Sequence, residues 1–152
     1  LRHFKNSAVN LHTSLLPFNK GSDPNFWSFV EGTPNGVSIH YMTEKLDKGD
    51  IIAQQMIIFD AKNHSFESSY AVLQENIKLL FKQNWTNIKA KICSKIPQNT
   101  LWDGKGTYHK SSDKDRLTPF LTNGWATNVA EFLENLKKHN IIKKPNLTQD
   151  KE

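Results

Sequence analysis

The chain has 152 residues, of which 37% are hydrophobic, and it carries a formal net charge of +5. Its single cysteine, Cys93, excludes an internal disulfide, and no apolar run of about 18 residues is present to form a transmembrane helix. Lysine carries nearly all the positive charge, whereas nucleic-acid surfaces favour arginine for bidentate contacts. We therefore expect a cytoplasmic protein with no membrane partner and no nucleic-acid partner.

The chain begins at Leu1 without an initiator methionine and enters an apolar run almost at once, at residues 7–11. Its length would suit one domain, but a mean hydropathy of −0.61 leaves a modest core for that length. A missing partner layer would explain the small core. We therefore expect the C-terminal portion of a longer protein.

In chain order, residues 7–11 predict a short buried strand. Asp23 followed by proline indicates a helix start, and the helix should run through Glu31 to a glycine at its end. Residues 36–43 alternate apolar and polar side chains, which is typical of a strand with one polar face. Residues 50–59 are rich in isoleucine and predict a second long strand, which we expect to pair with the strand at residues 36–43 as a hairpin-like unit.

The second half begins with the main amphipathic helix, because apolar residues recur at three- and four-residue steps over residues 65–93. Residues 97–116 lack a helical period and predict a loop with short strands. Asn128 and Glu131 have capping-box spacing and open a closing helix that ends at about His139. We divide the chain into a catalytic region (1–95), an extension with a loop and closing helix (96–142), and a disordered tail (143–152).

Three polar residues could carry acyl-transfer chemistry. Asn10 and His12 are two positions apart at the end of the first strand, so their side chains point to one face. Moving an acyl group between nitrogens needs a donor for the developing oxyanion and a group that manages the amine proton. Asp47, in a turn between strands, is the candidate carboxylate to orient or charge His12.

Each residue also has an ordinary structural role. Asn10 could satisfy local backbone groups, His12 could be a surface imidazole, and Asp47 could serve as a turn former. His40 and Gln54 lie near these positions, but we expect a cross-strand hydrogen bond from each and assign them no catalysis. Spacing alone leaves the structural and the chemical interpretation open.

The histidines form no close pair of metal-ligand spacing, so we predict no metal site. Aromatic rings could stack on a nucleotide base or a sugar, although core packing is the common alternative. We select Trp27, Trp102 and Tyr108 as candidate substrate contacts.

The segments 10–17 (NLHTSLLP), 20–21 (KG), 36–40 (GVSIH) and 46–54 (LDKGDIIAQ) resemble, in order and spacing, the folate-dependent formyltransferases. This resemblance implies a mixed α/β fold, here the C-terminal part of the sheet flanked by helices and lacking the N-terminal Rossmann-like half. One departure is Thr13, where many relatives carry proline, and it removes no functional group.

The resemblance further implies a catalytic set of Asn10, His12 and Asp47, with Asn10 and Asp47 also contacting the cosubstrate, 10-formyltetrahydrofolate. No metal is implied. The amino-acid sequence of residues 16–29 and 106–109 is most similar to that of the branch that acts on nucleotide-linked amino sugars in surface polysaccharide synthesis.

Three functional alternatives follow from the resemblance. The leading one is formyl transfer to the amine of a nucleotide-linked amino sugar. The second is formylation of methionyl-tRNA, for which a further RNA-binding domain is expected. The third, of another class, is a non-catalytic remnant used for binding or association. The sequence leaves a homodimer open.

Overall fold

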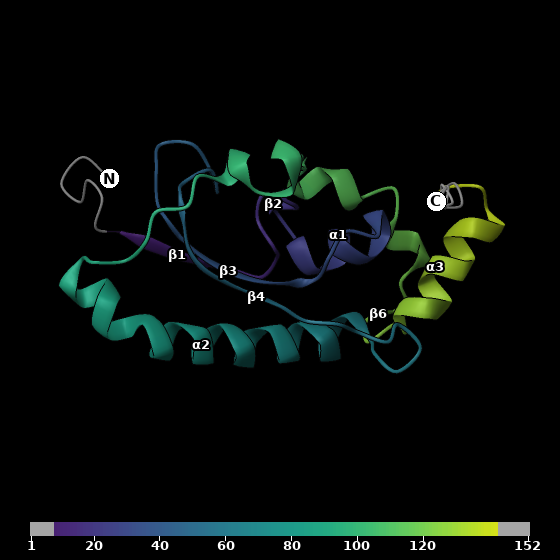
Figure 1. Ribbon diagram of the computed structural model, residues 1–152. Coiled ribbons are helices and arrows are strands. Elements are labelled where there is room, and N and C mark those ends of the chain that lie inside the picture. Colours follow the sequence, from purple (N-terminus) through teal and green to yellow (C-terminus); the bar gives the residue numbers. More distant parts are fainter. Residues whose placement is uncertain (1–7, 143–152) are drawn as a thin grey trace, which may run out of the picture.

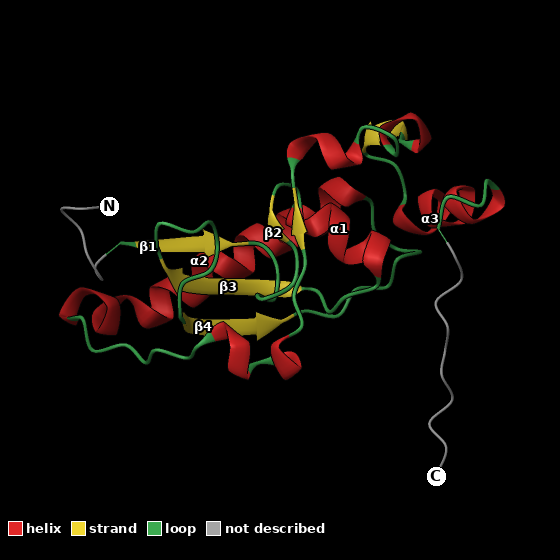
Figure 2. Ribbon diagram, turned by 90° about the horizontal axis from the view of Figure 1, so that it is seen from above, coloured by secondary structure: helices red, strands yellow, loops and turns green. Residues whose placement is uncertain are grey.

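A computed structural model describes residues 8–142 of the chain. Its central element is a three-stranded antiparallel sheet in the order β1 (Val9–His12), β3 (Gly36–Tyr41) and β4 (Ile51–Met56). Figure 2 shows the three strands side by side, with β3 in the middle. All three predicted strands are present, but β1 is not the buried strand that was predicted, because Leu11 is exposed, and β4 ends earlier than the predicted residue 59.

One face of the sheet is covered by α2 (Phe66–Ala90), the longest helix in Figure 1. The hydroxyl of Ser65 caps its first turn by accepting from the backbone N–H of Ser68. A stripe of buried leucine and isoleucine on α2 packs against alternate residues of the strands, and the core cluster comprises Val37, Ile39, Ile52, Leu73, Ile77 and Leu80. The predicted amphipathic helix is therefore confirmed, with its end at Ala90 and not at Cys93.

The opposite face of the sheet is polar. Residues that face each other in an antiparallel pair project to the same side, and the register places Asn10 opposite His40 and His12 opposite Ser38. Ser38 in turn faces Gln54 on β4. Five polar side chains therefore gather on the face that points away from α2.

A second, aromatic core lies beyond one end of the sheet. It joins α1 (Pro24–Glu31), the first turn of α2 and α3 (Val129–Lys138), with Phe26, Phe66 and Phe132 buried among them. Both predicted short helices are confirmed. Asp23 stands at the predicted cap position of α1, but its carboxylate makes no capping bond and instead pairs with Lys114.

After α2, the chain returns over the side of the sheet opposite that helix (Figure 1). The return consists of four short 3-10 turns, η1 (Gln98–Thr100), η2 (Trp102–Gly104), η3 (Ser111–Lys114) and η4 (Thr118–Phe120), with the strands β5 (Tyr108–His109) and β6 (Thr122–Trp125). β5 pairs in parallel with β2 (Lys20–Gly21). The returning chain therefore contacts the loop that follows β1. The short strand β5 lies within residues 97–116, where a loop with short strands was predicted.

Two further statements concern residues 8–142 only. None of the helices in this range has the length and apolar character that a bilayer crossing requires. The predicted disordered tail, residues 143–152, lies outside the described residues.

Candidate active site

The polar face of the sheet brings Asn10, His12 and Asp47 together. The Asn10 Nδ2 donates to Asp47 Oδ1 at 3.3 Å, and His12 Nδ1 lies 3.8 Å from Asp47 Oδ2. The second distance is too long for a direct hydrogen bond but short enough for an ion pair or a bridging water. Residues at the end of β1 and in the β3–β4 turn thus form one cluster.

His40 is a fourth member, which the sequence analysis did not assign to the site. Its Nδ1 lies 2.9 Å from the carbonyl oxygen of Tyr41, which can only accept, so Nδ1 donates there. The other nitrogen, Nε2, then accepts from Asn10 Nδ2 at 3.2 Å and lies 3.5 Å from Asp47 Oδ1. The expected cross-strand bond is present, and it places His40 against both Asn10 and Asp47.

Asp47 is buried and ionised. Burial alone would raise the pKa of its carboxyl group, but the contact with His40, the bond from the Gly21 N–H to Oδ2 at 2.9 Å and the nearby His12 outweigh it and lower the pKa to about 2. At neutral pH the site therefore holds a carboxylate, to which the side-chain N–H of Asn10 and the backbone N–H of Gly21 donate directly.

The turn that carries Asp47 is held from two sides. Asp47 itself has a left-handed backbone with φ of 51°. Gln98, from the chain that returns after α2, donates its side-chain N–H groups to the carbonyls of Asp47 and Gly49. A Cβ at Gly49 would lie 1.7 Å from the Tyr41 carbonyl oxygen, so only glycine fits this approach.

His12 is buried with its Nε2 positioned 2.9 Å from the backbone carbonyl of Asn19. Burial lowers the pKa of the imidazole, and the attraction of Asp47 offsets this only in part. Because a carbonyl only accepts, the neutral ring carries its proton on Nε2 and a lone pair on Nδ1, the atom that faces Asp47. His12 can therefore take up a proton at Nδ1 and form an ion pair with Asp47.

The loop after His12 is anchored to the polar face by Gln54 and Ser38. Gln54 Nε2 donates to Ser38 Oγ across the strands at 2.8 Å and to the carbonyl of Leu16 at 2.8 Å. The Ser38 hydroxyl donates to the carbonyl of Ser14 at 2.7 Å. The cross-strand bond expected of Gln54 is confirmed.

The three aromatic residues selected as substrate contacts do not meet in one place. Trp27 is 4% exposed and stacks on His109 with ring centroids 3.8 Å apart, which is the packing of a core residue. Trp102 and Tyr108 are half-exposed, and Trp102 lies against Phe18.

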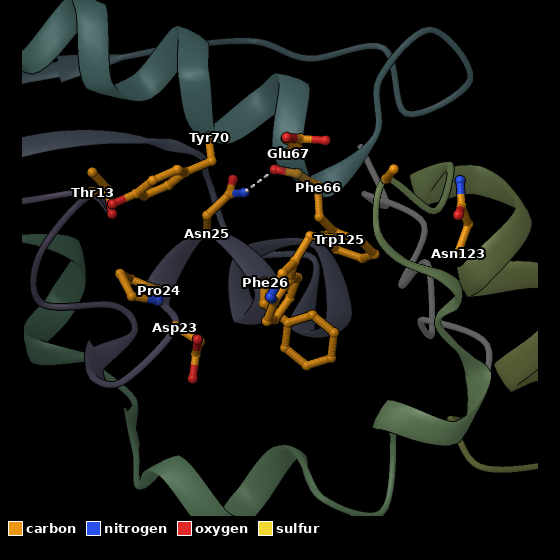
Figure 3. A pocket seen from close by; sticks show the side chains of 11 residues that line it. Thr13, Asp23, Pro24, Asn25, Phe26, Phe66, Glu67, Tyr70, Asn123 and Trp125 are labelled. Atoms are coloured by element: carbon orange, nitrogen blue, oxygen red, sulfur yellow. Dashed lines mark hydrogen bonds between the residues drawn. The ribbon is translucent and has the colours of Figure 1, made fainter.

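A cavity of about 630 Å³ is lined by other residues and by none of these three. Figure 3 shows the Tyr70 ring at one end of it, reaching toward Thr13, and Trp125 beside Phe26 at the other. Its lining comprises Thr13, Asp23, Pro24, Asn25, Phe26, Phe66, Glu67, Tyr70, Asn123, Trp125 and Ala126. Thr13 directly follows His12 in the chain, but none of the side chains of the polar cluster lines the cavity.

Across residues 8–142, no group of three or more histidine, cysteine, aspartate or glutamate side chains is arranged to hold a metal ion.

Fold and site together define an α/β protein with the groups that acyl transfer to nitrogen requires. The chain belongs to the formyl transferase family, because the family model described as "Formyl transferase" matches residues 1–84, more than half of the chain. This confirms the family resemblance identified from the sequence motifs.

Solved structures support the same fold. The formyltransferase PseJ from Anoxybacillus kamchatkensis, in complex with UDP-4,6-dideoxy-4-formamido-L-AltNAc and tetrahydrofolate, is 41% identical with a TM-score of 0.80, over 86% of this chain and 67% of that chain. A 4-N formyltransferase from Francisella tularensis is 28% identical with a TM-score of 0.67, over 82% of this chain and 50% of that one. The predicted α/β formyltransferase fold is thus confirmed.

Among curated proteins, the methionyl-tRNA formyltransferase of Listeria welshimeri is 48% identical over 61 residues. This match covers 39% of the present chain and 20% of that enzyme. The chain therefore spans only a small part of the curated relatives it matches, and half to two thirds of the two solved structures.

Proposed function

We propose that the protein carrying this chain transfers a formyl group from 10-formyltetrahydrofolate to the amine of a nucleotide-linked amino sugar. The observation that carries the proposal is the meeting of Asn10, His12 and Asp47 on one polar sheet face. The 41% identity to PseJ, whose structure holds a UDP-linked formamido sugar and tetrahydrofolate, supports this choice of donor and acceptor.

The residues present fit an acyl donor. When bound, 10-formyltetrahydrofolate would supply the formyl group, and Asn10 and Asp47 would contact it. The Asn10 amide would donate an N–H to the carbonyl oxygen, on which negative charge develops as the amine attacks. Both N–H groups of Asn10 now face His40 and Asp47, so the oxygen would replace one of these acceptors.

The attacking amine becomes positively charged as its bond to the formyl carbon forms, and it must lose a proton. His12 Nδ1 would accept that proton, since Nε2 is already committed to the Asn19 carbonyl. The resulting imidazolium would face the Asp47 carboxylate 3.8 Å away. Asp47 would act as the counter-ion of His12 until the imidazolium gives its proton to the departing nitrogen, whose bond to the formyl carbon breaks to release tetrahydrofolate.

The acceptor would enter through the cavity beside Thr13. Trp125 offers a half-exposed ring for stacking, and Asn123 and Asn25 offer amides for hydrogen bonds. Of the two carboxylates in this lining, Asp23 is paired with Lys114, whose Nζ also lies 5.6 Å from the centre of the Trp125 ring. We therefore place a sugar or base of the acceptor against Trp125.

Trp27 is too buried to contact a substrate. We therefore expect the acceptor contacts in the cavity and not at Trp27. Trp102 and Tyr108 stay candidates because their side chains are half-exposed. We assign residues 1–95 to the catalytic region and residues 96–142 to an extension that supports it. A role in surface polysaccharide synthesis in the cytoplasm would follow from this acceptor class.

The test is a formylation assay on the full-length protein with UDP- and dTDP-linked amino sugars. We expect formyl transfer, and we expect Trp125→Ala to raise KM for the sugar by about tenfold or more, since one stacked base is worth roughly 1–3 kcal/mol. Trp85→Ala on the exposed side of α2 is the matched control and should leave KM unchanged. An unchanged KM in Trp125→Ala would remove the acceptor from this cavity.

Methionyl-tRNA is the second candidate acceptor, favoured by the 48% identity to the Listeria enzyme over 61 residues. The same assay with initiator methionyl-tRNA separates the two. Formylation of the tRNA alone would overturn the sugar as acceptor. Formylation of neither would support a non-catalytic role in binding or association.

A further inference from the structure

Asn19 is a buried residue in the loop after β1, and each of its polar atoms has a partner. Its Oδ1 accepts from Ser28 Oγ at 3.0 Å and from Thr33 Oγ1 at 2.8 Å. Its Nδ2 donates to Glu31 Oε2 at 3.0 Å. Thr107 Oγ1 accepts from both the backbone N–H, at 2.8 Å, and Nδ2, at 3.3 Å. Such complete satisfaction fixes the residue in one orientation.

We propose that Asn19 is a positioning residue that fixes the tautomer of His12, and that Thr107 holds Asn19 in the orientation this requires. The proposal rests on the proposed function, because it concerns the proton that His12 is to accept. Thr107 lies outside residues 1–84, the part matched by the family model. The extension would thus contribute to the active site through a residue that never contacts substrate.

The argument follows from the backbone of Asn19. Its left-handed conformation, with φ of 54°, turns the carbonyl oxygen toward His12 Nε2. The bond requires a proton on Nε2, which leaves the lone pair on Nδ1 beside Asp47. Without this carbonyl, a proton on Nδ1 directed at the carboxylate would be the favoured neutral form. The ring would then have no lone pair at Nδ1 for the amine proton.

Asn19 is also linked to the extension through Glu31, which contacts His109. Glu31, which accepts from Asn19, also places its Oε1 3.0 Å from His109 Nε2. The backbone of this segment is secured as well, because Lys20 N–H donates to the Thr107 carbonyl and Ser22 N–H to the His109 carbonyl, both at 3.0 Å. A change at Thr107 alone should therefore leave the β2–β5 pairing in place.

The experiment compares Thr107→Val with wild type in the full-length protein. Valine has nearly the shape of threonine but cannot accept from Asn19. Thr107→Ser keeps the hydroxyl and should rescue the effect, and Thr122→Val, at an exposed hydroxyl on β6, is the matched control. Two kinds of measurement are made: NMR gives the tautomer of His12 from its imidazole nitrogen shifts, and steady-state kinetics give kcat and KM for formyl transfer.

We expect wild type, Thr107→Ser and Thr122→Val to hold His12 with the proton on Nε2, and Thr107→Val to show a mixture of tautomers. The kcat of Thr107→Val should fall about tenfold or more with KM nearly unchanged, because misplacement of a catalytic group acts on the chemical step. If valine prevents folding, Thr107→Ala is measured against Thr107→Ser in the same way.

An unchanged His12 tautomer in the folded valine or alanine variant would overturn the proposal, as would an equal loss of kcat in Thr107→Ser. The NMR measurement does not depend on activity. If wild type shows no formyl transfer while the tautomer still depends on Thr107, the proposed function fails and the positioning role stands.

Discussion

Gln98 and Asp47 are 51 positions apart, yet the side-chain amide of Gln98 donates to the backbone carbonyl of Asp47 at 2.8 Å. The same nitrogen donates to the carbonyl of Gly49, also at 2.8 Å. The turn that presents the carboxylate is thus held by the first residue of η1, which belongs to the extension. Together with Thr107 and Asn19, this makes two places where the extension determines the geometry of the site.

Replacing Gln98 with leucine tests the first of these contacts. The variant leaves two buried carbonyls without their donor, so the free energy of unfolding should fall by about 1–3 kcal/mol. The kcat for formyl transfer should also fall, because the turn that carries Asp47 loses its support. Urea unfolding and steady-state kinetics measure the two effects, with Gln83→Leu at an exposed position of α2 as control.

An equal free energy of unfolding in Gln98→Leu and Gln83→Leu would show that water replaces the amide as donor to the two carbonyls without loss of stability. In that case the turn is held by its own backbone and by Gly49.

The sequence predicted those parts of the fold that local physics determines. Periodicity predicted α2, end signals such as Asp23 with its proline and Asn128 with Glu131 predicted α1 and α3, and the two-residue spacing of Asn10 and His12 placed their side chains on one face. Nothing local shows that Gln98 contacts residue 47, since such a contact depends on how the chain returns after α2. The same holds for the stacking of Trp27 on His109, which turned a candidate substrate contact into a core residue.

His40 shows a different limit. Its position on the polar face was predictable from alternation, but its contact with Asn10 depends on the strand register. The β1–β3 pairing places His40 directly opposite Asn10, and a pairing shifted by two residues would keep the same faces but separate the two side chains. A pattern of apolar and polar residues does not specify which of these registers forms. With the register known, a histidine opposite Asn10 would have been recognised as part of the site.

Asp47→Asn should change the acid stability of the protein. The folded-state pKa of Asp47, about 2, lies below the ordinary value of 3.8, so its contribution is fully present above pH 3.8 and is lost as the pH falls through 2. The shift corresponds to about 2 kcal/mol. Unfolding free energies measured by urea between pH 2 and 5 should rise with pH in wild type by this amount.

In Asp47→Asn the free energy of unfolding should rise with pH by about 2 kcal/mol less than in wild type, because only the other acidic residues still contribute. An equally steep rise in both proteins would mean that Asp47 is not stabilised as an anion in the folded state.

The fall of kcat/KM at acid pH should occur below pH 6.5 because of His12. Burial lowers the pKa of His12 from 6.5, and only the neutral ring can accept the amine proton at Nδ1. A plot of kcat/KM against pH should therefore stay level to below 6.5 before it falls. An acid limb at or above pH 6.5 would contradict a buried, neutral His12.

The same lowered pKa has a consequence for stability. Below pH 6.5 the unfolded chain binds a proton at this position more readily than the folded protein does, so the free energy of unfolding falls as the pH drops. His12→Gln should lack this decline, and urea unfolding between pH 5 and 7.5 measures the difference, with His139→Gln at an exposed position as control.

His40→Leu should lower kcat by about tenfold with a smaller effect on KM. The change removes the acceptor of one Asn10 N–H and a neighbour of the Asp47 carboxylate, so the amide is free to turn away from the reacting carbonyl. Kinetics on His40→Leu and on His139→Leu measure the effect. Identical kinetic constants in the two variants would make His40 a strand residue without influence on the site.

Gly49→Ala and Gly32→Ala separate a steric clash from backbone strain. A Cβ at Gly49 would meet the Tyr41 carbonyl oxygen at 1.7 Å, so backbone must move, and we expect a loss of about 3 kcal/mol or more together with loss of activity. Gly32 has φ of 67° but open space around its Cβ position, so alanine there should cost only about 1–2 kcal/mol and leave activity intact. Urea unfolding and the formylation assay measure both, and equal losses in the two variants would show that the Asp47 turn adapts to a side chain at residue 49.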